Sequence, residues 1–194
     1  MIKIPAQNIA GTETLSDDDA TKLEAKMNKL INFLSTETIS SNKKMMRFFQ
    51  FIDDAMRAFR VEERSVCKKG CSYCCHVDVG ITIIEAQYIA LNTGHKYTPV
   101  KKRQHKGYHK TKTPCPFLVD DNCSIYEFRP LACRMFYSLD SVDFCKDESY
   151  PQHKIFQVES WGTAVNLYAE IYKSYKSGEF HHGDIREFFN QQEQ

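Results

Sequence analysis

Cysteine is the residue type in this sequence whose number and spacing point most directly to chemistry. Four cysteines fall within nine residues, in the stretch CKKGCSYCC, and four more follow at wider intervals. Clustered thiols of this kind form disulfides, act in redox or nucleophilic catalysis, or bind metal. A reducing compartment disfavours disulfides, and scattered buried cysteines would not cluster, so metal binding is the favoured interpretation. The predicted ligands are Cys67, Cys71, Cys74, Cys75, Cys115, Cys123, Cys133 and Cys145.

The spacing of the first four thiols lets three of them converge. On a helix, Cys67, Cys71 and Cys74 would point one way, and Cys75 would lie about 100° further round. Gly70 favours instead a tight metal-binding turn, because glycine tolerates positive φ. Both geometries bring three sulfurs together. Adjacent cysteines rarely reach one ion, so we expect Cys75 to serve a second centre, to support the ligands or to pack in the core.

The last four cysteines are separated by seven, nine and eleven residues, so the fold must bring them together. Eight thiols can form two tetrahedral Cys₄ zinc sites, or one iron–sulfur cluster with spare cysteines. Zinc modules usually carry C-x₂-C pairs in both halves of the motif, and only Cys71 with Cys74 has that spacing here. The irregular later spacing therefore favours an iron–sulfur cluster, and zinc stays open as the alternative.

Two arginines accompany the later cysteines. Four thiolates around a dication carry a net negative charge, which Arg129 and Arg134 could offset while their N–H groups orient the sulfurs. An ordinary surface or capping role is the alternative for both. We expect His76 to hydrogen-bond beside the ligands and Tyr126 to pack as a wall of the site.

The complete motif resembles a known family. CKKGCSYCC followed by CPFLVDDNCSIYEFRPLACR is similar to the YkgJ-like cysteine-cluster family, which is described as a zinc- or iron-chelating domain. The match runs from about Cys67 to Cys145. It includes all eight cysteines and Pro116, Leu118, Ile125, Tyr126, Arg129, Pro130 and Arg134. The resemblance implies a metal site built from the eight cysteines.

The same resemblance implies an enzymatic alternative. Flagellin lysine N-methylase (FliB) carries a similar cluster and looks like an iron–sulfur protein that methylates surface lysines. A redox protein is a further possibility in this class. The C-x₃-C-x₂-C spacing of Cys67, Cys71 and Cys74 equals that of radical S-adenosylmethionine enzymes, but the strand–helix repeats of those enzymes are missing. An enzyme should leave an exposed thiolate or a vacant metal position, whereas a closed Cys₄ site is structural.

Composition limits the other possibilities. With 194 residues, 42% of them hydrophobic, the chain can bury one sizeable core, so a single domain is expected. The net charge of +1 gives no global field for nucleic acid. The basic run over residues 95–114 is interpreted as a solvated loop. No secretion signal or membrane span is apparent, so we expect a cytoplasmic protein whose partner is a metal ion or cluster, with a protein partner or substrate possible.

Helices are expected on both sides of the cysteine region. Ser16 can cap a helix with buried positions Leu23, Met27, Leu30, Ile31 and Leu34, and Ser41 can cap a second with Met45, Phe48, Phe49, Ile52, Met56 and Phe59. A short extended piece over 77–82 precedes a helix that Gly94 ends. A long helix carries Trp161, Val165, Tyr168, Tyr172 and Tyr175, and a short amphipathic piece covers 185–189.

The sequence thus predicts a mainly α fold of about five helices around an irregular cysteine-rich middle, with little β structure. Residues 1–60 form an N-terminal helical pair, 61–150 the metal-binding core, and 151–194 the C-terminal helices.

Overall fold

The structure is a computed structural model that describes residues 15–36, 38–100, 113–139, 141–146, 161–173, 175 and 181–189. In these ranges the chain is mainly helical, with two small antiparallel sheets of two strands each, which confirms the predicted mainly α class. The chain divides into two compact units. Unit 1 comprises residues 1–66, 135–140 and 153–176, and unit 2 comprises 67–134, 141–152 and 177–194.

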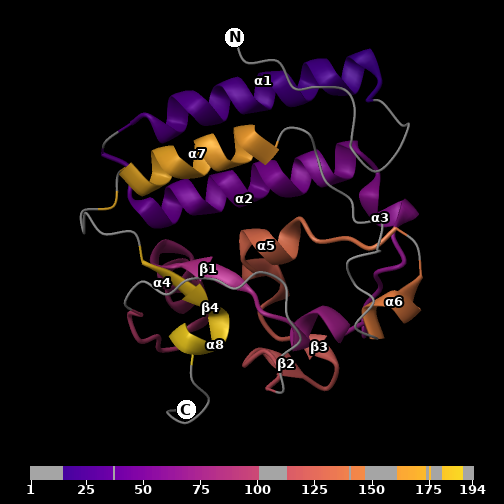
Figure 1. The fold of residues 1–194 in the computed structure, drawn as a ribbon. Coiled ribbons are helices and arrows are strands. Elements are labelled where there is room, and N and C mark those ends of the chain that lie inside the picture. Colours follow the sequence, from indigo (N-terminus) through magenta and orange to yellow (C-terminus); the bar gives the residue numbers. More distant parts are fainter. Residues whose placement is uncertain are drawn as a thin grey trace. The chain divides into compact units, whose positions relative to one another are not determined.

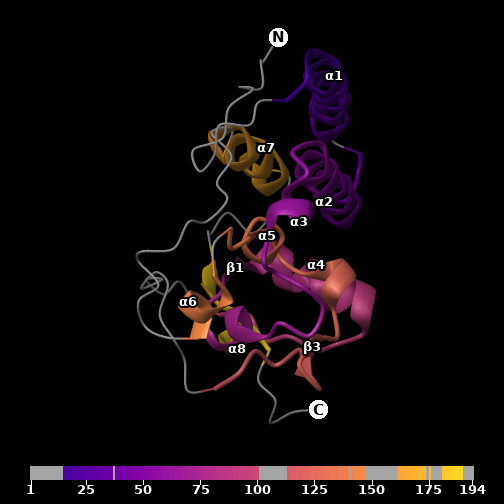
Figure 2. The same ribbon diagram turned by 90° about the vertical axis from the view of Figure 1, so that its right-hand side faces the viewer.

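Unit 1 consists of long helices that pack along one another. α1 (Asp17–Leu34), α2 (Ser41–Ala58) and α7 (Trp161–Lys173) all contact each other, and the short α3 (Val61–Arg64) follows α2. Figure 2 shows the three long helices nearly end-on. The buried faces of α1 and α2 carry the hydrophobic stripes that the periodicity predicts. Among the described side chains of α7 the buried residues are instead Leu167 and Ile171, while Tyr168 and Tyr172 of the predicted stripe are only partly buried. Fully or almost fully buried side chains on α1 and α2 include Leu23, Met27, Leu34, Met45, Phe48, Phe49 and Ile52.

The helix ends of unit 1 follow local sequence signals. Ser16 caps α1 as predicted, because its side chain accepts a hydrogen bond from the backbone N–H of Asp19. The predicted cap of α2 is wrong by one residue: Ser40 is the N-cap, and Ser41 is the first helical residue. Lys26 of α1 and Asp54 of α2 form an ion pair at 2.6 Å between the two helices. Phe48 and Tyr168 contact each other at 5.7 Å, so α2 and α7 share an aromatic contact.

Unit 2 is built from short elements joined by turns (Figure 1). Strand β1 (Gly80–Thr82) leads into α4 (Ile83–Thr93) and pairs with β4 (His182–Asp184), which leads into α8 (Ile185–Phe188). Strands β2 (Leu118–Val119) and β3 (Asn122–Cys123) form a hairpin. The 3₁₀ helices are η1 (Tyr73–His76) and η2 (Tyr126–Phe128), and the remaining short helices are α5 (Leu131–Arg134) and α6 (Val142–Lys146).

Aromatic side chains form the core of unit 2 next to a cysteine. Phe117, two residues after Cys115, is almost fully buried and lies edge-on to Phe189 at 4.8 Å and to His95 at 5.1 Å. The C-terminal segment therefore packs against the loop that carries Cys115. As predicted, Gly94 ends α4 in the left-handed conformation, with φ of 78°.

Several further predictions from the sequence can be compared with the described residues and with the division into two units. The expected extended piece before α4 is confirmed as β1. The C-terminal residues do not stay together, because α7 belongs to unit 1 and α8 to unit 2. The single domain expected from composition stays a prediction. Residues 101–112 of the basic run lie outside the described residues.

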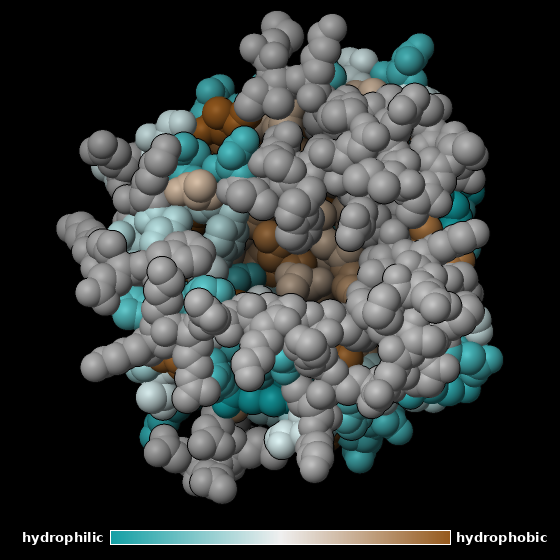
Figure 3. Space-filling model, viewed as in Figure 1, coloured by the Kyte–Doolittle hydropathy of each residue, from teal (hydrophilic) through white to brown (hydrophobic). Residues whose placement is uncertain are grey.

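The surface of the described residues carries mainly hydrophilic side chains and few large hydrophobic ones. Hydrophilic residues occupy much of it on the face shown in Figure 3. The exposed large hydrophobic residues are Met46, Tyr73, Leu91, Val119 and Tyr126. None of the helices in the described ranges is both long and apolar enough to cross a membrane.

Candidate metal centre

All eight cysteines are among the described residues, all lie in unit 2, and none of them is in a disulfide. Cys115 and Cys145 are buried, Cys74 is exposed, and the other five are partly buried. The fold therefore collects into one compact unit two groups of cysteines that are far apart in the sequence.

The first cysteine segment is a tight turn followed by a 3₁₀ helix. Gly70 has φ of 84°, and the N–H of Cys71 donates to the carbonyl of Lys68 at 3.0 Å, so the turn interpretation is confirmed over the helical one. Cys74 and Cys75 both lie in η1. Burial raises the pKa of Cys71, and the thiols of Cys67 and Cys74 raise it further, so these three thiols interact electrostatically.

The second cysteine segment uses a hairpin that the sequence analysis did not predict. Asp120 and Asp121 form its turn with φ of 47° and 57°, a conformation that Asp tolerates better than most residues. The strand register pairs Leu118 with Cys123. The adjacent Asp-Asp-Asn sequence was the available signal, but strands of two residues leave no alternating pattern to detect.

Three contacts bring the segments together. The N–H of Cys115 donates to the carbonyl of Cys75 at 2.7 Å. Helix α6, which carries Cys145, contacts η1, which carries Cys74 and Cys75. Hydroxyl Oγ of Ser72 also donates to a carboxylate oxygen of Asp121 at 2.9 Å, so the hairpin turn is tied to the first segment.

Four thiols form an electrostatic group. Burial raises the pKa of Cys133 well above its usual value, and the nearby thiols of Cys74, Cys115 and Cys123 raise it further. Burial also raises the pKa of Cys123, to which Cys74 again contributes. Thiols that interact in this way lie close together and resist simultaneous ionisation, and a bound cation would remove that resistance.

Cys74 joins the two segments of the motif. A hydrogen bond with the thiol of Cys75 raises the pKa of Cys74 well above its usual value, and desolvation adds to the effect. The hydrogen bond is the larger of these two causes, and the charge of Arg129 opposes the shift. Cys74 is near Cys71 in the first segment and near Cys123 and Cys133 in the second.

Backbone N–H groups approach three of the sulfurs in a repeated pattern. Burial raises the pKa of Cys71, Cys115 and Cys123, in the case of Cys115 to about 11, and in each a backbone hydrogen bond opposes the shift. The donor is the N–H two residues later, which belongs to Tyr73, Phe117 and Ile125 respectively. Such donors stabilise a thiolate and orient it, as outer partners of metal ligands do.

The two predicted arginines differ in their surroundings. The charge of Arg129 lowers the pKa of Cys74, Cys123 and Cys133, so its guanidinium lies where it could offset thiolate charge. It also stacks on the Tyr126 ring at 3.8 Å. Arg134 is buried and donates to the carbonyls of Arg129 and Glu127, contacts that hold η2 against α5.

The thiols are gathered without forming a finished coordination shell. Among the described residues, no group of three or more His, Cys, Asp and Glu side chains has the arrangement of a metal site. The assignment of all eight cysteines as ligands, and of both arginines as supporting residues, therefore stays a prediction. The donor set, soft thiols with N–H groups directed at sulfur, is one that zinc and iron–sulfur clusters prefer.

Sequence reasoning missed two residues that hold the cysteine segments. Glu85 is buried at the start of α4 and accepts a hydrogen bond from the N–H of Leu131, two residues before Cys133. Arg186 of α8 donates to the carbonyl of Cys75. Arg186 had no sequence signal. The Thr82-x-x-Glu85 pattern predicts the capping box of α4 but not the contact with Leu131, because that partner is a backbone group at a distant position of the chain.

Comparison with known proteins identifies the cysteine region. Residues 66–157, somewhat less than half of the chain, match the family model CxxCxxCC, described as "Putative zinc- or iron-chelating domain". A search of curated proteins and a search of solved structures each found no match.

Proposed function

We propose that this chain, whose residues 66–157 belong to the CxxCxxCC family of zinc- or iron-chelating domains, holds a metal centre in unit 2 through cysteine thiolates. The observation that carries the proposal is the repeated N–H contact to sulfur at Cys71, Cys115 and Cys123. A protonated thiol is only a weak acceptor for these N–H donors. A thiolate ligand gains both charge stabilisation and a fixed direction.

The electrostatic group supports a first centre ligated by Cys74, Cys115, Cys123 and Cys133, with Arg129 offsetting its negative charge. A second set would consist of Cys67, Cys71, Cys75 and Cys145, which lie on the turn, on η1 and on the helix that contacts η1. In this division Cys74 and Cys75 belong to different centres. This agrees with the expectation that two adjacent cysteines rarely bind the same ion.

For the first centre we prefer an iron–sulfur cluster to zinc, because its ligands include three of the irregularly spaced later cysteines. The second set would then hold a separate centre or remain as spare thiols. When bound, a cluster would supply electron transfer, whereas zinc in a closed Cys₄ site would supply folding energy. The role of the protein groups is the same in both cases. They bring deprotonated sulfurs together, offset their charge and exclude water from the buried thiols of Cys115 and Cys145.

One observation favours the enzymatic alternative. Cys74 is an exposed residue while the other cysteines are buried or partly buried, so one member of the centre lies at the surface of the protein near Arg129. An exposed ligand is what an enzyme that uses the cluster would need, whether as a redox protein or as a FliB-like protein lysine N-methyltransferase. We also infer a reducing, cytoplasmic location, because clustered thiols that bind metal must stay reduced.

Anaerobic purification, followed by metal analysis, acid-labile sulfide analysis and a visible spectrum, tests the proposal. A brown protein with iron and sulfide in equal amounts supports the cluster. A colourless protein that contains zinc and no sulfide supports metal binding and rejects the cluster. A protein that retains neither metal, and binds neither on reconstitution with Zn²⁺ or with Fe²⁺ and sulfide, contradicts the proposed function.

A further inference from the structure

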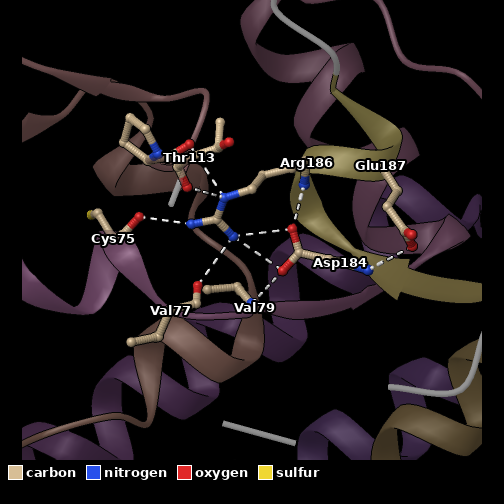
Figure 4. A network of polar contacts seen from close by, with 8 residues as sticks. Cys75, Val77, Val79, Thr113, Asp184, Arg186 and Glu187 are labelled. Carbon is tan, nitrogen blue, oxygen red and sulfur yellow. Dashed lines mark hydrogen bonds and ion pairs between the residues drawn. The ribbon is translucent and has the colours of Figure 1, made fainter. Parts of the chain in front are cut away.

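Arg186 lies outside the residues that match the family, yet its guanidinium is surrounded by groups from the cysteine region (Figure 4). Nη2 donates to the carbonyl of Cys75 at 2.8 Å, and Nη1 donates to the carbonyl of Val77 at 3.1 Å. Nε donates to the carbonyls of Thr113 and Pro114 at 2.8 and 3.2 Å. One side chain thus binds four backbone carbonyls from two separate segments.

Those carbonyls sit next to the predicted ligands. Cys75 is itself one of the eight cysteines and follows Cys74 directly, and Pro114 immediately precedes Cys115. The carbonyl of Cys75 also accepts the N–H of Cys115 at 2.7 Å. The guanidinium therefore fixes the spacing between the first cysteine segment and the start of the second where the two are joined by this hydrogen bond.

The guanidinium is held in place by its own segment. Asp184 accepts from Nη1 of Arg186 at 3.0 and 3.1 Å, and from the N–H of Val79 at 2.7 Å. Glu187 completes a capping box by accepting the N–H of Asp184 at 3.2 Å. Strand β4 pairs with β1, with Asp184 opposite Gly80, so β4 and α8 are attached to the chain that follows η1.

Burial makes these contacts strong. The side chains of Arg186 and Asp184 are 13% and 17% exposed, so the pair is only weakly screened by solvent. The planar guanidinium presents five N–H donors in a fixed fork, which is what allows it to reach carbonyls on both segments at once. A lysine ammonium in the same place would keep the charge but could not span the same set of acceptors.

We propose that Arg186 is a positioning residue of the metal centre: it locks the Cys75 and Cys115 segments at the separation that metal binding requires. The functional metal-binding unit would then extend beyond residue 157 to include β4 and α8. This inference rests on the proposed function, because it concerns how well the same thiols bind metal.

The test compares Arg186→Lys and Arg186→Gln with the wild-type full chain. The matched control is Arg47→Gln, which removes the same charge from an exposed position of α2 in unit 1. Metal-free proteins are titrated anaerobically with Co²⁺, whose thiolate charge-transfer bands report coordination, and then with Zn²⁺ against a chromophoric chelator. Far-UV circular dichroism of each metal-free protein measures its helical content.

We expect both Arg186 variants to bind about 10- to 100-fold more weakly than wild type, the range typical of lost outer partners of metal ligands. Their Co²⁺ spectra should also change, since the thiolates no longer converge in the same geometry. Arg47→Gln should match wild type in both affinity and spectrum. Because α1, α2 and α7 lie in unit 1, the helical signal should persist in all variants.

The outcomes separate the inference from the proposed function. Wild-type affinity and spectrum in Arg186→Gln overturn the inference and leave metal binding intact. If Arg186→Lys has the metal affinity and Co²⁺ spectrum of wild type, the positive charge is sufficient and the guanidinium contacts are not required. This result also overturns the inference. A wild-type protein that binds neither Co²⁺ nor Zn²⁺, and forms no cluster with Fe²⁺ and sulfide, removes the proposed function itself.

Discussion

Cys133 and Cys71 represent the two segments of the motif and provide the most direct test of single ligands. Changing either to Ser removes a soft thiolate that a hydroxyl cannot replace, so metal affinity should fall on the order of 10-fold or more. Thermal stability should fall with it, because metal binding and folding are coupled. Metal analysis and thermal melting of the purified variants measure both quantities.

Met46→Ser is a suitable control for these variants, since it removes an exposed sulfur-containing side chain from α2. It should keep wild-type metal content. If Cys71→Ser or Cys133→Ser also keeps full metal content and melting temperature, that cysteine is not a ligand.

The raised pKa of the Cys115 thiol should make the stability of the metal-free protein depend on pH. Burial raises its folded-state pKa from 9.0 to about 11. Because the folded pKa lies above the unfolded one, the stabilising contribution is complete below about pH 8.5 and is lost as the pH rises to about 11. The free energy of unfolding should fall by up to about 2 kcal/mol over this window.

Denaturant unfolding of the metal-free protein at pH 8, 9.5 and 11 measures this loss. In Cys115→Ala the titrating thiol is absent, so the decline across the window should be shallower than in wild type. Parallel pH profiles for the two proteins would show that Cys115 does not contribute.

At the level of the helices, Glu85 connects the start of α4 with the start of α5. One of its carboxylate oxygens accepts the N–H of Thr82 at 2.9 Å, which completes the capping box of α4. The other accepts the N–H of Leu131 at 2.9 Å, at the start of the helix that carries Cys133. Its side chain is buried, so a lost acceptor would leave these N–H groups without a partner.

We therefore expect Glu85→Ala to lose roughly 1–3 kcal/mol of stability and to bind metal more weakly, because α5 is no longer held against α4. Glu85→Gln keeps an oxygen acceptor and should fall between wild type and Glu85→Ala. Chemical denaturation and Zn²⁺ competition titrations measure the two effects. Equal stability of all three proteins would contradict this role.

The distribution of cysteines over the whole molecule predicts an unequal response to metal removal. Unit 2 contains all eight cysteines, while the packing of unit 1 depends on hydrophobic helix faces. A ligand stabilises the state that binds it, so a bound metal should stabilise unit 2 selectively. After chelation, hydrogen exchange should accelerate in η1, the β2–β3 hairpin and α5 much more than in α1 and α2.

Hydrogen exchange followed by mass spectrometry, with and without a chelator, measures this difference. A uniform acceleration across both units would instead indicate that they unfold together as the single domain expected from composition.

The sequence by itself determined the features that depend on near neighbours. Helical periodicity and caps such as Ser16 and Gly94 are encoded within a few residues, and so is the turn at Gly70. The spacing of the cysteines likewise predicted a chelating domain, which the family match confirms at that level. Each of these features could be predicted because it depends only on the conformations available to residues that are close in the sequence.

Only the tertiary structure decided which distant groups meet. It brought Cys74 near Cys123 and Cys133, attached Glu85 to Leu131, and placed Arg186 against the carbonyls of Cys75 and Thr113. The acceptors of Arg186 are backbone carbonyls, which every residue possesses, so no side-chain pattern marks them. These carbonyls come within reach of Arg186 because the buried contact between Phe117 and Phe189 holds the C-terminal segment against the loop that carries Cys115.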